Sequence, residues 1–571
     1  MTKNADVAQA LKEISLLLEV EGENPYRLRA YSKAVRSISS LGEDIEAIAS
    51  RDELTNIPGI GTGIAAKIEE YLRTGTIDML DDLRARTPVD VLELDAIPGV
   101  GPKTIKLVYD ELGVNDLESL EEAALSGKIA TLRGMGEKSQ TQILEGIELV
   151  KAGIGRTLLA EAMPHAETIR EKLLKHSDVN RAVITGSYRR RRETVRDIDI
   201  LVDASSAEAV MNLFVSMNNV MDIIAQGETK SSIRLENNLQ VDLRVVPSES
   251  FGAGLQYFTG SVDHNVHLRS KAIKMGLLLN EYGLFKDDER IAGNDEEDVY
   301  AALGLPWIPP ELREDRGEIE AAQSNSLPIL IETDDIRGDL HSHTDQSDGS
   351  NTIEEMLDAA DSLGYEYYCV SDHTQSLTIA NGMDEDRLLK RIEEIDELNS
   401  SGRWNLKILK GAEVDILADG ILDIEDDVLA QLDIVTVSVH SRMKDTKEVM
   451  TARVCEAIKN KHVHILGHPT GRLLLKRSEF EIDLEQVFAV AKKHNVAMEL
   501  NAHPWRLDLD AGNLRAAKRE GLKIAINTDA HKIPELHYMK YGIYQARRGW
   551  LTKEDVLNTY PLDDLLVALQ K

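Results

Sequence analysis

Residues 185–203 read TGSYRRRRETVRDIDILVD, and this stretch decides how the middle of the chain is interpreted. The apolar residues of "DIDILV" predict a β-strand, on which Asp197 and Asp199 leave from the same face. Taken alone, such a pair is more often a solvated strand face than a site. The four arginines ahead of it change that estimate, because they suit a phosphate group and the carboxylates suit a metal ion held against it.

The neighbouring sequence adds the remaining parts of such a site. Asp242 lies in a second strand-like stretch, LQVDLRVV at 239–246. Three carboxylates at one edge repel one another unless a divalent cation compensates them. Upstream, Gly186 permits a close backbone approach, Ser187 offers a hydroxyl, and Arg190 offers a fork for phosphate oxygens. These parts predict a two-metal phosphoryl or nucleotidyl transfer.

Length and composition indicate a multidomain globular protein. The chain has 571 residues, 42% hydrophobic and 29% charged, with no apolar run long enough for a membrane span and no signal peptide. Only two cysteines are present, so we expect no disulfide framework and a cytoplasmic location. The formal net charge of −33 repels nucleic acid as a whole, so DNA binding requires locally concentrated basic residues, as at 189–192. The alternative is simply an acid-coated surface.

Three similar segments open the chain, each a Gly-x-Gly turn followed by a helix-period run: IPGIGTGIAAKIEEYL from Ile57, IPGVGPKTIKLVYDEL from Ile97 and LRGMGEKSQTQILEGI from Leu132. One such turn is usually a tight connection without a ligand. Three copies resemble helix-hairpin-helix motifs, which hold the DNA backbone without reading bases. The candidate DNA-binding glycines are Gly59, Gly61, Gly99, Gly101, Gly134 and Gly136.

The remaining chain divides by pattern into two further structural regions. Short strands alternate with helices over 151–310, which predicts a mixed α/β unit, and a segment with prolines and polar residues over 311–335 predicts a linker. We expect helical domains at 1–90 and 91–150, the α/β domain at 151–310, and a last domain at 336–571.

The last domain holds 11 of the 15 histidines. Seven strand-like runs recur there with helical stretches between most of them, which predicts a parallel barrel, and functional groups lie at the C-terminal strand ends of such barrels. Nine imidazoles and carboxylates fall at these ends and suit zinc, manganese or iron, although any single histidine could be a polar rim residue. They are His341, His343, Asp348, His373, Glu413, His440, His468, Asp529 and His531.

The middle of the chain resembles the family X DNA polymerases, the group that includes DNA polymerase beta. The resemblance rests on TGSYRRRRETVRDIDILV, VDLRVV and YFTGSVDHNVHLRSKAIKMGLLLNEYGL. It implies a nucleotidyltransferase palm in which Asp197 and Asp199 hold two Mg²⁺ ions and Asp242 lies near the primer 3′-hydroxyl. It also implies a set of residues that bind the dNTP and the nascent pair: Arg156, Gly186, Ser187, Arg190, Tyr257, Phe258, Gly260, Asn265 and Arg269.

The nine ligands of the second half match, in order, the pattern of the PHP (polymerase and histidinol phosphatase) family, so that 336–571 is expected to form a distorted (β/α)₇ barrel. Joined to a family X polymerase, this domain resembles that of bacterial and archaeal PolX enzymes. The resemblance implies up to three Mn²⁺ or Zn²⁺ ions and 3′-5′ exonuclease, 3′-phosphatase or phosphodiesterase, and abasic-site endonuclease activities. His462, His464, His494 and His503 fall outside the pattern, and we interpret them as structural or supporting residues.

Two departures from the family pattern affect these expectations. Arg196 replaces a glycine before the paired aspartates, which bears on turnover more than on metal binding. The N-terminal part of the chain resembles the family's lyase domain. Lys67 occupies the position of the family's Schiff-base lysine, and Tyr31 occupies the position of that domain's tyrosine. Gly63 and Arg27 replace lysines of the vertebrate pattern there, so Lys67 is equally consistent with a surface residue and with a 5′-deoxyribose phosphate lyase.

Our leading prediction is a monomeric gap-filling DNA polymerase of base excision repair, acting on gapped or primed DNA and dNTPs, with a metal-dependent nuclease that processes 3′ ends. Two alternatives stay open. The second half could be a phosphoesterase of histidinol-phosphate type that the front half brings to DNA, or the chain could be a DNA-end scaffold whose polymerase site Arg196 disables. The sequence does not give the reason for the acidic composition.

Overall fold

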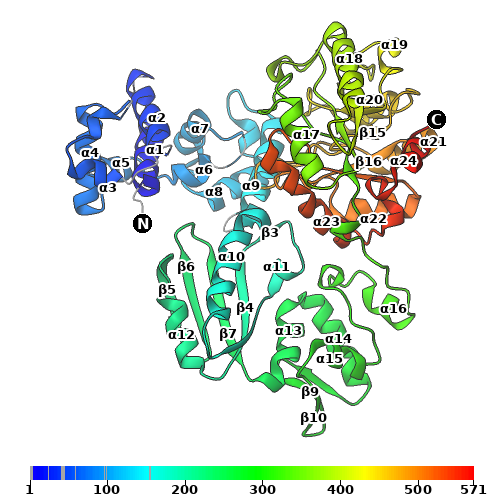
Figure 1. Cartoon of the computed structure of the whole chain (residues 1–571). Coiled ribbons are helices and arrows are strands. Elements are labelled where there is room, and N and C mark those ends of the chain that lie inside the picture. The colour runs from blue at the N-terminus through cyan, green and yellow to red at the C-terminus, as the bar shows by residue number, and fades with distance from the viewer. Residues whose placement is uncertain are drawn as a thin grey trace. The chain divides into compact units, whose positions relative to one another are not determined.

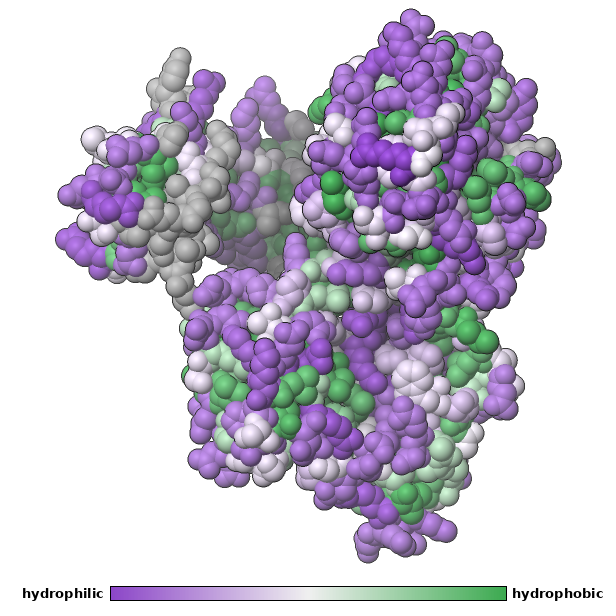
Figure 2. Space-filling view, viewed as in Figure 1, coloured by the Kyte–Doolittle hydropathy of each residue, from purple (hydrophilic) through white to green (hydrophobic). Residues whose placement is uncertain are grey.

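The computed structural model describes residues 4–23, 25–39, 45–57, 59–95, 97, 99–153 and 156–570. The chain forms two compact units, Met1–Ile154 with Leu475–Arg477, and Gly155–Leu474 with Ser478–Lys571 (Figure 1). The surface in view is largely hydrophilic, with apolar residues in small groups (Figure 2). Among the described residues, none of the helices combines the length and the apolar character that a membrane span requires.

The first unit is helical, as the sequence predicted, and a single hydrophobic core joins its helices. The core runs from Leu11 and Leu17 near the chain start to Ile105 and Ile147, so it spans both segments, 1–90 and 91–150, that we expected as separate domains. The helices are α1 (Asn4–Glu21), α2 (Pro25–Ser39), α3 (Ile45–Ser50), α4 (Thr62–Thr74), α5 (Asp78–Arg86), α6 (Val91–Asp95), α7 (Pro102–Leu112), α8 (Leu117–Leu125) and α9 (Glu137–Gly153).

The repeated glycine turns share one backbone geometry. Their first glycines, Gly59, Gly99 and Gly134, have φ of +96°, +86° and +83°. Only glycine adopts this region without a steric penalty, which explains the residue type at these positions. The second glycines of the first two turns, Gly61 and Gly101, are extended and immediately precede α4 and α7.

The second unit begins with a mixed five-stranded sheet in the order β2-β4-β7-β6-β5 (Figure 1). The central pair β4 and β7 is parallel, and the other neighbours are antiparallel. A two-stranded pair, β1 (Thr157–Leu158) with β3 (Thr194–Val195), lies beside it. The elements of the sheet and its helices are β2 (Val179–Ile184), β4 (Asp197–Ala204), β5 (Val220–Gln226), β6 (Lys230–Leu235), β7 (Gln240–Val246), α10 (Leu159–Leu174), α11 (Gly186–Arg189) and α12 (Ala207–Val215).

Alternation along β4 gives the sheet one covered face and one face with a site. Ile198, Ile200 and Val202 are buried in the core formed with α10 and α12. The odd-numbered residues point to the other face, where Leu201 packs with Phe251 of the following helix. Successive strand side chains alternate, so Asp197 and Asp199 share the face of Leu201.

Helices and a small antiparallel sheet follow, around a core that contains Leu268, Leu284 and Tyr300. The segment 311–335, expected as a linker, contributes Leu312 and Ile319 to this core and carries a short helix. The elements are α13 (Phe251–Thr259), α14 (Val262–Lys274), β8 (Leu278–Asn280), β9 (Gly283–Lys286), β10 (Glu289–Ala292), α15 (Glu296–Ala302) and α16 (Glu318–Gln323).

Residues 336–570, all of them described, form the predicted barrel of seven parallel strands in chain order. A parallel bridge from Ser342 to Ala530 joins the continuations of the first and last strands, so the sheet is nearly closed. The strands are β11 (Gly338–Asp339), β12 (Tyr367–Val370), β13 (Lys407–Asp415), β14 (Ile434–Ser438), β15 (Ile465–Leu466), β16 (Ala497–Asn501) and β17 (Ile524–Asn527).

Helices surround these strands, and one helix closes an end of the barrel. An apolar cluster from all seven strands or their continuations packs with Leu565 and Leu569 of the last helix. That end is filled, so polar side chains gather at the C-terminal strand ends. The helices are α17 (Ile353–Ser362), α18 (Glu385–Ser401), α19 (Asp426–Leu429), α20 (Lys447–Ala457), α21 (Leu484–His494), α22 (Ala511–Glu520), α23 (Met539–Arg548) and α24 (Leu562–Leu569).

Candidate active sites

The three aspartates predicted on neighbouring strands lie together on the central parallel pair. Asp199 on β4 is directly opposite Asp242 on β7, and Asp197 precedes Asp199 by one strand period on the same face. A hollow of about 130 Å³ opens beside them, lined in part by Asp199, Lys230, Asp242 and Arg244. The structure therefore places the three carboxylates together on one face of the sheet, as the strand pattern predicted, and Asp199 and Asp242 line the hollow.

The electrostatics of this trio favour a bound cation. Burial, together with the charges of Asp197 and Asp242, raises the pKa of Asp199 to about 7. Burial and Asp242 also raise the pKa of Asp197. Burial acts in the same direction on Asp242, but the hydrogen bond from Lys230, whose Nζ lies 2.9 Å from the carboxylate, holds its pKa below the usual value. Hard oxygen donors under mutual repulsion fit magnesium ions.

The turn between β2 and β4 needs glycine for two reasons. Gly186 has φ +61°, and a Cβ there would lie 2.6 Å from Oδ2 of Asp199. The backbone of α11 consequently lies against the carboxylates, and Ser187 follows in the same turn, partly exposed. Gly260 has a similar role, because its Cβ would lie 2.9 Å from Nη1 of Arg190.

The four arginines at 189–192 do not form an open positive patch. Arg189 forms a buried pair with Glu296 at 2.9 Å, and Arg190 donates to Glu314 at 3.2 Å and to the carbonyl of Thr259 at 2.6 Å. Arg191 lies over the ring of Tyr544 at 4.3 Å, and Arg192 approaches Glu314 at 3.7 Å. Acidic and aromatic partners distant in sequence thus occupy the cluster that sequence analysis interpreted as phosphate-binding charge.

Arg156 and Arg196 lie at the edge of the same site. Arg156 donates to the hydroxyl and the carbonyl of Thr194 at 2.7 and 2.5 Å. Burial, followed by the charges of Arg192 and Arg196, lowers its pKa. Arg196 is exposed and also acts on Asp197, so it adds positive charge beside the carboxylates.

The predicted nucleotide-binding segment lies on α13 and α14. Tyr257 and Phe258 are partly exposed and stack edge-to-face at 5.1 Å, and Phe258 lines the hollow beside the aspartates. Asn265 is buried and donates to the carbonyl of Tyr257 at 2.7 Å. Arg269 donates back to the carbonyl of Asn265 at 3.3 Å, so only part of this set faces the hollow.

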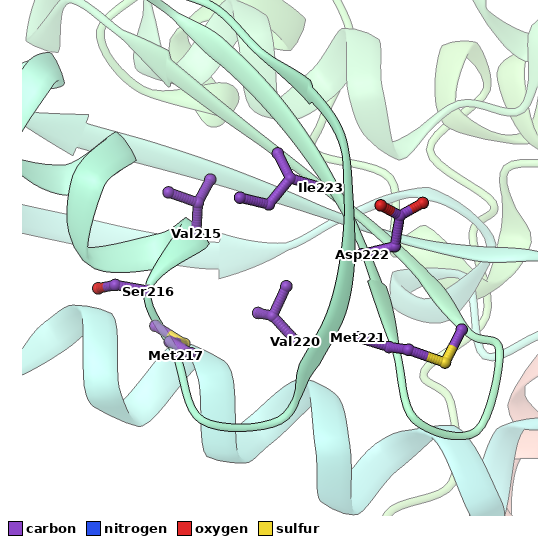
Figure 3. A pocket seen from close by; sticks show the side chains of 7 residues that line it. All are labelled: Val215, Ser216, Met217, Val220, Met221, Asp222 and Ile223. Carbon is purple, nitrogen blue, oxygen red and sulfur yellow. The ribbon is translucent and has the colours of Figure 1, made fainter. Parts of the chain in front are cut away.

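A second hollow on the palm lies away from these residues. It measures about 410 Å³ and lies between the end of α12 and β5 (Figure 3). Its lining is mainly apolar, with Asp222 as the one carboxylate among the lining residues. Nothing in it matches the chemistry of the aspartate trio. The lining residues are Val215, Ser216, Met217, Val220, Met221, Asp222 and Ile223.

The nine predicted barrel ligands converge at the C-terminal strand ends. Among the described residues, three groups of side chains each place ligand atoms within 4.8 Å of one another. His468 belongs to none of the three but lies 3.0 Å from Glu413 through Nε2. The groups are His343, Asp348, His373 and His531; His341, His343, Glu413 and Asp529; and His373, Glu413 and His440.

Unsatisfied buried atoms point to metal as the missing partner of these side chains. His341 Nε2, His343 Nδ1, His373 Nδ1, His468 Nδ1 and Glu413 Oε2 are buried and make no hydrogen bond in the described part of the chain. Buried polar atoms are otherwise nearly always satisfied. Imidazole nitrogens and carboxylates at this density fit zinc or manganese.

The charges of this cluster are tightly balanced. Burial and the neighbouring His531 and His373 lower the pKa of His343 to about 4, so this imidazole is neutral and able to ligate. Burial would raise the pKa of Glu413, but His373, His440 and His341 together hold it well below its usual value. Although burial opposes it, the neighbouring carboxylates raise the pKa of His440 to about 10 and that of His531 to about 9, so a metal ion must displace protons from these imidazoles in order to bind.

Sequence analysis missed the residues that orient these ligands. Glu499 on β16 is fully buried and lies 2.7 Å from His341 Nδ1, while accepting from the backbone N–H of His468 at 2.6 Å. Asp415 lies 2.9 Å from His440 Nδ1. A carboxylate on the second ring nitrogen fixes which nitrogen is left for a metal. The alternation of VAMELNAH, which turns Glu499 into the barrel, was the available signal.

The residues named for a lyase lie on helices of the first unit. Lys67 on α4 donates to the carbonyl of Gly63 at 3.2 Å. Tyr31 on α2 is buried, and burial raises its pKa. Its hydroxyl lies 3.6 Å from the sulfur of Met79.

Comparison with known protein families matches four segments of the chain. A helix-hairpin-helix domain matches residues 2–77 and a SAM-like helix-hairpin-helix tandem matches 91–148. The DNA polymerase beta thumb matches 254–314, and the PHP domain matches 339–503.

Whole relatives agree with these domain matches. DNA polymerase/3'-5' exonuclease PolX of Bacillus subtilis (strain 168) is 40% identical over 570 residues, covering 99% of each chain. DNA polymerase lambda of Rattus norvegicus is 25% identical over 54% of this chain and 56% of its own. A probable phosphatase of Thermoanaerobacter sp. (strain X514) is 30% identical over 39% of this chain and 89% of its own.

A palm with three clustered aspartates joined to a ligand-rich barrel defines a family X DNA polymerase with a PHP domain. The chain belongs to the PolX family of such enzymes. The resemblance found in the sequence is confirmed, and so is the predicted fold class.

Proposed function

We propose that this enzyme fills short gaps in DNA during base excision repair and prepares 3′ ends with its barrel site. The observation that carries the proposal is the presence, in one chain, of two separate ligand clusters of different chemistry. Three carboxylates at the palm suit magnesium, and the imidazole-rich groups of the barrel suit manganese or zinc.

At the palm, Asp197 and Asp199 would hold two Mg²⁺ ions, and Asp242 would ligate beside the primer 3′-hydroxyl. The ions would stabilise the charge that develops on the attacking and leaving oxygens. Ser187, Arg190 and Arg156, with the backbone at Gly186, would hold the triphosphate of the dNTP. Tyr257, Phe258 and Gly260 would contact its sugar, and Asn265 with Arg269 would lie beside the nascent pair.

At the barrel, the nine ligands would hold up to three Mn²⁺ or Zn²⁺ ions. Clustered ions supply a hydroxide nucleophile and compensate the leaving oxygen of a phosphodiester. Glu499 and Asp415 hold His341 and His440 in orientation for this role. The likeness to a probable phosphatase supports action on phosphate esters such as 3′-phosphates, and we extend the proposal to the phosphodiester beside an abasic site.

The helical unit would hold duplex DNA on either side of a gap. The turns at Gly59, Gly61, Gly99, Gly101, Gly134 and Gly136 present backbone N–H groups at helix starts, and such groups suit phosphate oxygens. This binding is compatible with the net charge of −33, because it depends on local geometry and not on the field of the whole protein. Lys67 is the candidate for a lyase reaction in this unit.

The proposal is tested on a one-nucleotide gapped duplex with Mg²⁺ and on a 3′-overhanging primer with Mn²⁺. Asp199→Asn should reduce gap filling by about a thousandfold or more, since it removes a metal ligand, and should leave trimming intact. His343→Ala should do the reverse. Asp222→Asn, an exposed acid on the same sheet, and His462→Ala, a histidine outside the ligand set, are the controls. Gap filling that survives in Asp199→Asn would overturn the proposal.

A further inference from the structure

Helix α23 of the barrel contacts the arginine turn of the palm, defined here as residues 189–193. Three of its side chains meet three residues of that turn. The ring of Tyr544 lies under Arg191, Gln545 donates to Glu193 at 2.5 Å, and Arg548 Nη1 donates to the carbonyl of Arg190 at 3.0 Å. Figure 1 shows α23 beside α11, from which the arginine turn begins.

Arg548 also shares a carboxylate with Arg190. Glu314 Oε1 lies 3.2 Å from Arg190 Nε and 3.2 Å from Arg548 Nη1, and its other oxygen lies 3.7 Å from Arg192. The Glu314 side chain is 14% exposed and that of Arg548 is 5% exposed. Burial alone would raise the pKa of Glu314, but Arg190, Arg548 and Arg192 together lower it, so the carboxylate is ionised.

A carboxylate on Arg190 stands where a phosphate oxygen would bind. Glu314 and a triphosphate therefore compete for the same guanidinium. If Arg190 leaves a buried carboxylate, that charge needs another cation, because an uncompensated buried charge is strongly unfavourable. Arg548 is in place for this role. Its Nε is buried and makes no hydrogen bond in the described part of the chain, so a further donor is available.

We propose that Arg548 is a positioning residue for nucleotide binding: it holds the arginine turn by its backbone and keeps Glu314 paired when Arg190 turns to the triphosphate. The proposal deepens the polymerase function and rests on it. It assigns part of the nucleotide site to a helix of the barrel, more than 350 residues beyond Arg190 in sequence.

Substitution of Arg548 tests this directly. In Arg548→Gln, Glu314 loses one of its cationic partners and pairs more strongly with Arg190. The KM for the dNTP should therefore rise about tenfold, which is the effect of one charge-assisted hydrogen bond. The kcat should change much less. Arg547→Gln is the matched control. Arg547 precedes Arg548 on the same helix but pairs with Glu311 and Glu332. The KM of the Arg547→Gln variant for the dNTP should therefore stay at the wild-type value.

A second substitution separates positioning from a loss of structure. In the double variant Arg548→Gln with Glu314→Gln, the competing charge is gone, and KM should return toward the wild-type value. A merely structural role predicts that the two substitutions add. Unchanged KM in Arg548→Gln, or a double variant worse than either single one, would overturn the inference. Two further measurements separate this inference from the proposed function. Gap filling by the wild-type enzyme tests the polymerase function itself, and Mn²⁺-dependent trimming by Arg548→Gln shows whether the variant is still folded.

Discussion

Single residues set the chemistry of both sites. Asp199 faces Asp242 across β4 and β7, and burial together with the charges of Asp197 and Asp242 raises its pKa to about 7. Glu296 is the opposite case, since Arg189 and Arg313 surround it and lower its pKa despite its burial. Lys230 and Arg244 only partly offset the repulsion at Asp199, whereas two arginines pair directly with Glu296, and this difference separates a candidate metal site from a structural ion pair.

The raised pKa of Asp199 predicts a pH dependence of Mg²⁺ binding. Below about pH 7 the carboxyl is protonated in the metal-free protein, so Mg²⁺ must displace a proton and its apparent affinity falls, by up to about tenfold for each pH unit. Above this pKa the affinity levels off. Isothermal titration between about pH 5.5 and pH 8 measures it, and an affinity that is constant across this range would contradict the electrostatic account.

Loss of the buried carboxylate at Glu296 should destabilise the protein. Glu296→Ala leaves Arg313, which is fully buried, and Arg189 without their partner, at an expected loss of about 3–5 kcal/mol in the free energy of unfolding. Urea denaturation followed by tryptophan fluorescence measures this loss, and Trp307, whose indole N–H donates to Glu296, is one of the four tryptophans that contribute to the signal. Glu297→Ala, a substitution of the exposed neighbour, is the control. Equal stability of the two variants would refute the view that Glu296 forms a stabilising buried ion pair.

At the scale of elements, backbone conformation explains which glycines the helical repeats require. Gly99 has φ +86° with open space around it, whereas Gly101 is extended at φ −104° with open space as well. The two positions differ in backbone conformation and not in steric room. Alanine substitutions at the two glycines therefore isolate the effect of backbone conformation on stability.

Gly99→Ala should destabilise the helical unit by about 1–2 kcal/mol, the cost of a left-handed conformation for an L-residue. Gly101→Ala should have little effect, since alanine adopts extended backbone freely. Hydrogen exchange of the α7 amides is the measurement. Faster exchange in both variants, or in neither, would mean that positive φ is not what requires glycine in these turns.

The sequence predicted elements well where local pattern and position determine the outcome. The seven barrel runs predicted by their strand character are β11–β17, and the ligands fall at their ends because parallel strands end at one rim. The D-x-D spacing placed Asp197 and Asp199 on one face for the same local reason. The partners of the arginine turn could not be predicted this way. Glu296, Glu314 and Arg548 are more than 100 residues away in sequence, and only the fold brings them together.

At the scale of the whole molecule, the second unit holds both candidate sites, one proposed to form phosphodiester bonds and the other to break them. Their ligand sets share no residue, and they differ in donor type, oxygen at the palm and mostly nitrogen at the barrel. The contacts of Tyr544, Gln545 and Arg548 connect the two parts structurally without merging the sites. Each activity should consequently be removable without the other.

The most direct test uses a primer that ends in a dideoxynucleotide, annealed to a longer template with dNTPs, Mg²⁺ and Mn²⁺. Such a primer cannot be extended until its last nucleotide is removed, so full-length product requires both sites. The wild-type enzyme should give full-length product, His343→Ala should leave the primer unchanged, and Asp199→Asn should shorten it without extension. Mixing the two variants should restore the product. Removal of the dideoxynucleotide by His343→Ala, or extension by Asp199→Asn, would contradict the account of two independent metal sites.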